Sequence, residues 1–233
     1  MMLNIVLVIL LVLIANAICF QCNKNSRKNS FNLMMSEETY SETLNSIRSA
    51  ARMGDVDKLQ EIVKNWQKND ILNDRTGDMM GLCPLHWAVA AGIRSRKQCV
   101  EVLLNAGAAV DAVNSAGNTP LHYACATQKT ECASILIDFK ANVNAKGLSG
   151  QSPLHLCAMK DDIDTLQLLL SKGAIINDVD NNGDTALHFS RRFGNKRSEK
   201  LLIEYRADIN IKNNKGQTPY DYEAAEITNF SYE

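Results

Sequence analysis

The sequence of 233 residues has few of the features that mark enzymes and nucleic-acid-binding proteins. Aromatic residues make up only 6%, which is low for a base-stacking surface. Lys and Arg number 25 against 26 Asp and Glu, so the basic excess expected for binding nucleic acid is absent. The sequence contains no phosphate-binding loop, nucleophile elbow or HExxH motif. We therefore expect no catalytic residue, metal site or cofactor.

The chain also lacks an apolar run of the roughly 20 residues that cross a membrane comfortably. Its longest run, Ile5 to Ile14, has the length of the apolar core of a secretory signal peptide. Ala15-Asn16-Ala17 follows as an A-x-A-like cleavage site, although no Lys or Arg precedes the run. These features predict a signal peptide over residues 1–17, cleaved before Ile18, and a secreted or secretory-pathway protein.

Two alternatives place the protein elsewhere. If the run is not cleaved, Lys24, Arg27 and Lys28 behind it would keep the rest of the chain in the cytoplasm, anchored to the membrane. If translation starts at Met34 or Met35, the product is a soluble cytoplasmic protein. Polar residues 18–36 are predicted to form a flexible linker. The sequon at Asn229 is a possible glycosylation site only in the secretory pathway.

Close CxxC pairs of the kind that bind zinc are missing from most of the chain. Of the seven cysteines, Cys19 and Cys22 lie near the proposed cleavage site, and five are spread over residues 83–157. Cys99 and Cys132 occupy equivalent positions in two copies of a repeat, which are expected to lie too far apart for a disulfide. The five are therefore predicted to be free and to act as small buried hydrophobes.

What the sequence does have is a repeated tetrapeptide. A glycine precedes each copy by the same offset, with steps of 36, 33, 33 and 33 residues between copies. The copies begin at Cys83, Thr119, Ser152 and Thr185, with a decayed fifth at Thr218.

Each part of the tetrapeptide suits the start of a helix. Thr119 can cap the helix, and Pro120 fits the first helical position, where its missing N–H costs nothing. A second apolar helix follows, with Gly107 and Gly173 placed to end it in a left-handed conformation. A short segment in which apolar and polar residues alternate, as they do in a β-strand, and a turn complete the unit. Since one unit cannot bury its apolar face alone, neighbouring units must stack.

The chain resembles the ankyrin repeat family, whose T-P-L-H-x-A signature has a period of 33 residues, over roughly Leu44 to Glu223. The resemblance implies an all-α solenoid of stacked helix-turn-helix pairs with short β-hairpin fingers, in a repeat array over residues 37–233. It predicts an N-terminal cap at about 40–77, full repeats at about 78–113, 114–146, 147–179 and 180–212, and a C-terminal cap at 213–233.

Two repeats depart from the family pattern. The first full repeat carries three extra residues around Ile93 to Lys97, which lengthen the turn between its helices. In the fourth, Arg191, Arg192 and Phe193 replace small residues and Glu199 replaces an aliphatic one. We expect this fourth repeat either to be the least stable or to be shaped by a partner.

The four histidines of the chain are expected to be structural. Each is the last residue of a tetrapeptide copy, so they stand roughly 10 Å apart along the stack, too far to share one zinc ion. The resemblance implies that each imidazole bonds locally and to the adjoining repeat. The expected structural set is Thr119, Pro120, His86, His122, His155 and His188.

The resemblance further implies a protein-interaction scaffold or adaptor that binds on its concave face. A regulatory subunit of an enzyme and a self-associating structural array are the alternatives. We expect a monomer that binds a protein or peptide, no nucleic acid, and a membrane only if residues 1–17 are uncleaved. The predicted contacts run from an apolar end to a basic end. This order suits a partner in which an apolar segment is followed by an acidic one. The predicted contacts are Met79, Met80, Leu82, Ser115, Ala116, Asn118, Thr127, Leu148, Gln151, Met159, Lys160, Asn182, Asp184, Arg192 and Phe193.

Overall fold

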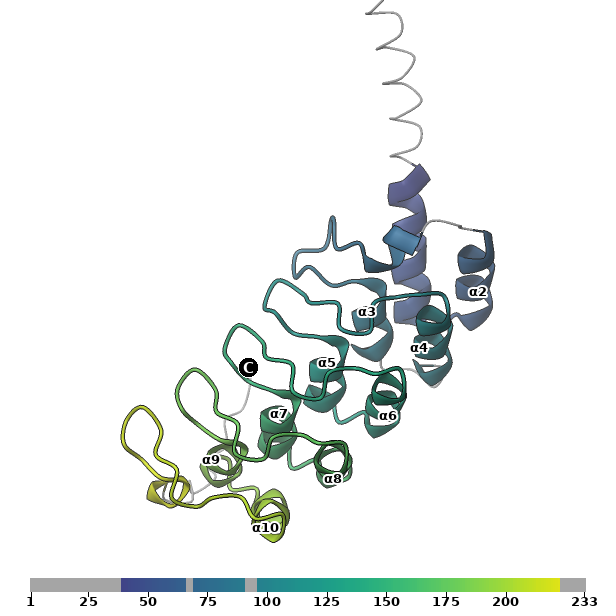
Figure 1. The fold of residues 1–233 in the computed structure, drawn as a ribbon. Helices are drawn as coiled ribbons and strands as arrows, with labels where there is room; N and C mark the ends of the chain where they lie inside the picture. Colours follow the sequence, from purple (N-terminus) through teal and green to yellow (C-terminus); the bar gives the residue numbers. More distant parts are fainter. Residues whose placement is uncertain (1–38, 66–68, 91–95, 223–233) are drawn as a thin grey trace, which may run out of the picture. The chain divides into compact units, whose positions relative to one another are not determined.

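The computed structural model describes residues 39–65, 69–90 and 96–222 (Figure 1). The chain divides into two compact units, Met1–Asn45 and Ser46–Glu233. Residues 39–45 of the first unit are helical. The predicted signal peptide 1–17, the linker 18–36, residues 91–95 of the lengthened turn and Asn229 lie outside the described residues. No helix within the described ranges is long and apolar enough to cross a membrane.

The second unit is built from paired helices. In Figure 1, α3, α5, α7 and α9 form one row, α4, α6, α8 and α10 form a second row, and long loops extend beside the first. This arrangement confirms the predicted all-α repeat solenoid. Helical residues 46–53 come first, and then α2 (Val56–Asn65), η1 (Asn69–Asn73), α3 (Pro84–Ala90), α4 (Arg96–Asn105), α5 (Pro120–Ala126), α6 (Thr130–Asp138), α7 (Pro153–Lys160), α8 (Ile163–Ser171), α9 (Ala186–Arg192), α10 (Lys196–Glu204) and η2 (Pro219–Asp221).

The tetrapeptide sets where each first-row helix begins. Thr119 has an extended backbone, and Pro120 is the first residue of α5. The third helical residue, His122, accepts a hydrogen bond at Nδ1 from the backbone N–H of Thr119, at 3.1 Å. The imidazole thus takes the role that Glu or Gln has in an ordinary capping box. Because α5 has only seven residues, packing rather than helix propensity must hold it together.

A continuous apolar core runs along the stack. The leucine of each tetrapeptide is at most 1% exposed, and so is one leucine in each second-row helix. Burying a leucine stabilises a fold by about 1.5–3 kcal/mol, so this set dominates the cohesion between repeats. The two series are Leu85, Leu121, Leu154 and Leu187, and Leu103, Leu136, Leu169 and Leu202.

The fingers between the helix pairs are loops rather than the predicted β-hairpins. The described residues form no strand, and only an isolated antiparallel bridge joins Val179 and Thr185. Backbone hydrogen bonds join neighbouring fingers at single positions, for example from the Leu148 N–H to the Ala116 carbonyl at 3.0 Å. A single backbone hydrogen bond per pair of fingers does not make a β-ladder, so the alternation of apolar and polar residues in the fingers does not produce a sheet.

The second-row helices end in the left-handed conformation that was predicted from the glycines in the sequence. Gly107 and Gly173 have φ values of +92° and +89°, in the left-handed region. Lys140 and Arg206 hold the equivalent positions of the other two repeats with φ values of 69° and 65°. The local conformation is therefore conserved along the stack even where no glycine is present.

Candidate functional site

The fingers and the first-row helices together form a surface that we call the finger face. It comprises the finger tips at residues 78–82, 114–118, 147–151, 180–184 and 213–217, with α3, α5, α7 and α9 beside them (Figure 1). Several large apolar side chains on it are exposed to solvent. Met79 is fully exposed, Leu148 is 70% exposed, and Met80 and Phe193 are about half exposed.

Most of the predicted contact residues lie at the surface, but two do not. Leu82 is buried beneath the first finger and Asp184 is 1% exposed, so the expectation that they are available to a partner is wrong. Asn118, Thr127, Gln151, Met159 and Arg192 are half-buried. The exposed members are Met79, Met80, Ser115, Ala116, Leu148, Lys160, Asn182 and Phe193.

Asp184 is buried among three polar partners at the C-terminal end of the stack. Its Oδ1 accepts hydrogen bonds from Asn213 Nδ2 at 2.8 Å and from the Tyr222 hydroxyl at 3.3 Å, and its Oδ2 pairs with Arg192. Burial alone would raise the pKa of Asp184, but the hydrogen bonds from Asn213 and Arg192 outweigh it and lower the pKa. Arg192 also lies over the Tyr222 ring, 4.6 Å from its centroid.

A second cluster holds the neighbouring arginine. Arg191 Nη1 lies 3.2 Å from Glu199 Oε1, and its guanidinium lies 4.6 Å from the centroid of the Tyr220 ring. Two of the four departures from the family pattern in the fourth repeat, Arg191 and Glu199, therefore pair with each other. Arg191 and Arg192 are both held within the chain, so the predicted basic end is less available to an acidic partner than the sequence suggests.

The four imidazoles each tie one repeat to the next. The Nδ1 atom of His155 accepts from the backbone N–H of Ser152 at 3.1 Å, and Nε2 lies 3.1 Å from the carbonyl oxygen of Asp184. An accepting Nδ1 requires the neutral tautomer that carries its proton on Nε2. Burial lowers the pKa of His155 accordingly. His86, His122 and His188 make the equivalent bonds to the carbonyls of Asn118, Gln151 and Gln217.

Four of the five finger tips are held by an Asp or Asn at their base. The side-chain oxygen of Asn114 accepts from the backbone N–H groups of Ala116 and Asn118, both at 2.9 Å, and Asn114 Nδ2 donates to the Tyr123 hydroxyl at 3.0 Å. We call this arrangement the tip latch. Sequence reasoning did not single it out, although its signal was present as an Asp or Asn repeated at the finger base. The other latches are at Asp78, Asp180 and Asn213.

The third finger lacks a latch, and the finger face is hollowed beside it. Gly147 stands where the others have Asp or Asn, and Leu156 stands where the second repeat has Tyr123. A hollow of about 200 Å³ lies here, between the second and third repeats. The predicted contact residues Ala116, Asn118, Leu148 and Gln151 line it, together with His122, Tyr123, Ala126, Gly147, Ser149 and Leu156.

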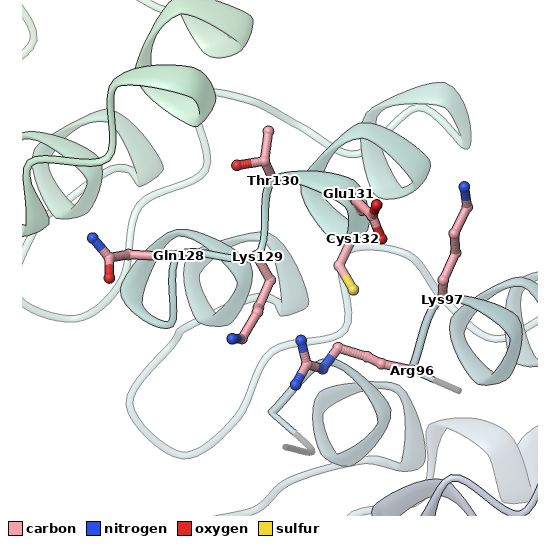
Figure 2. Close-up of a pocket in the computed structure, with 7 residues that line it drawn as sticks. All are labelled: Arg96, Lys97, Gln128, Lys129, Thr130, Glu131 and Cys132. Atoms are coloured by element: carbon pink, nitrogen blue, oxygen red, sulfur yellow. The ribbon is translucent and has the colours of Figure 1, made fainter. Parts of the chain in front are cut away.

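A larger hollow, of about 320 Å³, lies where the turn before α6 meets the start of α4 (Figure 2). Arg96, Lys97 and Lys129 bring positive charge to it, and Glu131 brings negative charge. The Cys132 thiol in its lining is nearly fully buried, and burial raises its pKa from 9.0 to about 11. Since the thiolate is the reactive form, this cysteine is not poised as a nucleophile at neutral pH.

The other four cysteines within the described residues are also buried, free thiols. Cys83, Cys99, Cys125 and Cys157 form no disulfide with any described residue, and burial raises the pKa of Cys83, Cys99 and Cys157. Within residues 39–65, 69–90 and 96–222, no three His, Cys, Asp or Glu side chains come together in a way that could hold a metal ion.

Comparison with known families gives one match. A model of ankyrin repeats in three copies matches residues 47–147 and 139–213. The two matched segments run from the helix before α2 to the base of the fifth finger, and so include α3 to α10. No curated protein sequence matches the chain.

Proposed function

The chain belongs to the ankyrin repeat family, whose repeats are generally protein–protein interaction modules, and from this we propose that its finger face binds a protein partner as a scaffold or adaptor. On this proposal the protein supplies a preformed surface, and any chemistry belongs to what it binds. The partner places an apolar segment along the finger tips.

The observation that carries the proposal is the apolar character of the finger tips. Most of the side-chain surface is exposed to water at Met79, Met80 and Leu148. Apolar surface that stays in water does not stabilise the isolated array. Exposed apolar side chains grouped on one face are typical of interaction sites, and methionine adapts readily to different partners.

The latched fingers support the proposal because they are fixed before binding. Asp78 Oδ1 accepts from the Met80 N–H at 2.9 Å and from the Leu82 N–H at 3.1 Å. The Trp87 indole N–H donates to Asp78 Oδ2 at 3.1 Å, which ties this tip to α3. A partner that docks on Met79 and Met80 therefore avoids much of the entropy cost of ordering a loop.

Introducing a negative charge at apolar positions of the finger face tests the proposal. Proteins captured from a lysate of the native source by the wild-type chain are compared with those captured by Met80→Glu and Leu148→Glu variants. Ile203→Glu is the matched control, because Ile203 is 41% exposed on α10, in the second row. We expect the two finger-face variants to lose the partners that Ile203→Glu retains.

Retention of every partner by Met80→Glu and Leu148→Glu would contradict the proposal. Size-exclusion chromatography of the purified chain distinguishes partner binding from self-association, because an array that binds only other proteins elutes as a monomer. An activity screen of the same sample tests for catalysis.

We propose that the apolar N-terminus directs the protein into the secretory pathway, with cleavage before Ile18. The motifs that support this are the apolar run and Ala15-Asn16-Ala17. N-terminal sequencing of the native protein tests it. Ile18 at the N-terminus is the expected result, Met1 would indicate an uncleaved anchor, and Met34, Met35 or Ser36 would indicate a cytoplasmic product.

A further inference from the structure

The third finger presents a pair of backbone donors that the other fingers satisfy internally. In every latch, one side-chain oxygen accepts from the second and the fourth N–H after it. The distances are 2.9 and 3.1 Å at Asp78, 2.9 and 2.9 Å at Asn114, 2.8 and 2.9 Å at Asp180, and 3.0 and 3.0 Å at Asn213. Gly147 has no side chain to do this. The N–H groups of Ser149 and Gln151 accordingly have no acceptor among the residues described.

The third finger nonetheless keeps the conformation of its latched neighbours. Its tip is closed by the Gly147 N–H bonding the Gln151 carbonyl at 3.1 Å, as the Asn114 N–H bonds the Asn118 carbonyl at 3.0 Å in the second finger. The Ser149 carbonyl also accepts from the Asn181 N–H of the fourth finger at 3.1 Å. The two unsatisfied donors are therefore held as a preformed pair.

Apolar walls surround this donor pair. Leu148, 70% exposed, stands on one side of the hollow, and Tyr123 and Leu156 come from the two adjacent first-row helices. In the first and second repeats, the residue equivalent to Leu156 offers a polar atom to the latch, whereas leucine offers none. At about 200 Å³ the hollow is smaller than the roughly 300–1,000 Å³ of small-molecule sites, and so it suits a protein side chain.

We propose that this hollow binds an Asp or Asn side chain of the partner, next to a large apolar residue. The partner's side-chain oxygen takes the place that Asx oxygens occupy in the other fingers and accepts from the Ser149 and Gln151 N–H groups. The apolar neighbour packs on Leu148 and Leu156. The inference rests on the proposed function and names the chemistry that the finger face recognises.

The test begins with random twelve-residue peptides displayed on phage and selected on the immobilised full-length chain. The affinities of the enriched peptides are then measured for designed variants. The main variant is Gly147→Asn combined with Asn118→Ala, which supplies an internal latch. The second change is needed because a Cβ at position 147 would lie 2.4 Å from Asn118 Oδ1. Asn118→Ala alone is the reference for the double variant, because Asn118 itself lines the hollow. Gly173→Asn is the control away from the hollow, since Gly173 has open space around it.

We expect the enriched peptides to share an Asp or Asn beside a large apolar residue. Changing that Asp or Asn to Ala should weaken binding to the wild-type chain by at least tenfold, because the two hydrogen bonds to the Ser149 and Gln151 N–H groups are lost. The double variant should bind the peptides more weakly than Asn118→Ala alone by a similar factor, and Gly173→Asn should stay within about threefold of the wild type. The peptide substitution needs no protein variant, so the test stands even if the double variant folds poorly.

Two results would overturn the inference, and they differ in what they say of the proposed function. The first result is a set of peptides that lose affinity for Met80→Glu but either lack a shared Asp or Asn or bind the double variant as well as the wild type. This result would rule out the hollow as a site and leave finger-face binding in place. Peptides unaffected by any finger-face variant, or no retained peptide at all, would count against both.

Discussion

The Nε2 atom of His86 lies 3.0 Å from the backbone carbonyl oxygen of Asn118, one repeat further along the chain. The other ring nitrogen, Nδ1, accepts from the backbone N–H of Cys83 at 3.3 Å. The ring is fully buried, so it bridges two repeats only in its neutral form. Burial accordingly lowers the pKa of His86 from 6.5 to about 4, and it also lowers the pKa values of His122 and His155.

These shifts predict that the array loses stability in mild acid. Between pH 6.5 and about 4 the unfolded chain binds more protons than the folded one, so the free energy of unfolding rises with pH in this window. His86 alone should contribute about 3 kcal/mol that is present above pH 6.5 and lost as the pH falls toward 4. Urea unfolding measured from pH 7.5 to 4.5 gives this slope.

The carboxylates do not obscure the effect. The pKa values of Asp78 and Asp184 are lowered, so their contributions are lost only below their ordinary pKa of 3.8. A His86→Gln variant should show a shallower slope than the wild type. A free energy of unfolding that stays constant between pH 7 and 5 would contradict the prediction.

Arg192 should matter for the stability of the array. An Arg192→Ala variant leaves the Asp184 carboxylate, whose side chain is 2% exposed, with Asn213 and Tyr222 as its remaining partners. Because a third of the Arg192 side chain is exposed, we expect a loss of about 1–2 kcal/mol in the free energy of unfolding, below the cost of breaking a fully buried pair.

Chemical denaturation of Arg192→Ala and Arg197→Ala measures this contribution. Arg197 is exposed on α10 and makes no ion pair with the described part of the chain, so its variant should change stability by less than about 0.5 kcal/mol. Equal effects of the two substitutions would show that the Asp184 pair adds nothing.

The stacking was predictable from the tetrapeptides, whereas the burial of Asp184 and the loop structure of the fingers were not. Thr119 and Pro120 mark the start of α5 by local rules of capping and backbone geometry, which need no knowledge of neighbouring repeats. The burial of Asp184 depends on Arg192, Asn213 and Tyr222, and the last two of these partners lie 29 and 38 residues away along the chain. Period-2 alternation in the fingers suggested strands, but strands form only where several consecutive residues pair with a neighbour.

The tip latch should stabilise the second finger. Asn114→Ala removes the acceptor for the Ala116 and Asn118 N–H groups and the donor to the Tyr123 hydroxyl. We expect a loss of about 1–3 kcal/mol in the free energy of unfolding, as for other half-buried polar groups left unpaired. Tyr123→Phe removes only one of the three bonds and should cost about 1 kcal/mol. Thermal unfolding of both variants gives the comparison, and a larger effect for Tyr123→Phe would refute this account of the latch.

The five cysteines of the array should resist alkylation while it is folded. All are buried, and a pKa of about 11 at Cys132 leaves roughly a hundredfold less thiolate than the ordinary value of 9.0. Iodoacetamide labelling at pH 7.5, followed by peptide mass spectrometry, should show slow modification of native Cys83, Cys99, Cys125, Cys132 and Cys157. The rate should rise at least a hundredfold in guanidinium chloride. Rapid labelling of native Cys132 would instead indicate an accessible thiolate in the hollow of Figure 2.

Two glycines should differ in how they tolerate a side chain. Gly173 and Gly183 both have a left-handed backbone, with φ values of +89° and +77°. Any L-residue there costs about 1–2 kcal/mol. A Cβ at Gly183 would also lie 2.9 Å from the backbone nitrogen of Asn214 in the fifth finger, whereas a Cβ at Gly173 meets nothing within 4 Å.

Gly183→Ala should therefore destabilise the array by at least about 1 kcal/mol more than Gly173→Ala, since the fourth and fifth fingers must separate to admit the methyl group. The separation strains the hydrogen bond from the Asn214 N–H to the Asn182 carbonyl, now 2.9 Å. Hydrogen exchange of the Asn214 amide should accordingly quicken in Gly183→Ala and stay unchanged in Gly173→Ala. Similar unfolding energies for the two variants, with an unchanged Asn214 amide, would show that the fingers do not pack as closely as the structure describes.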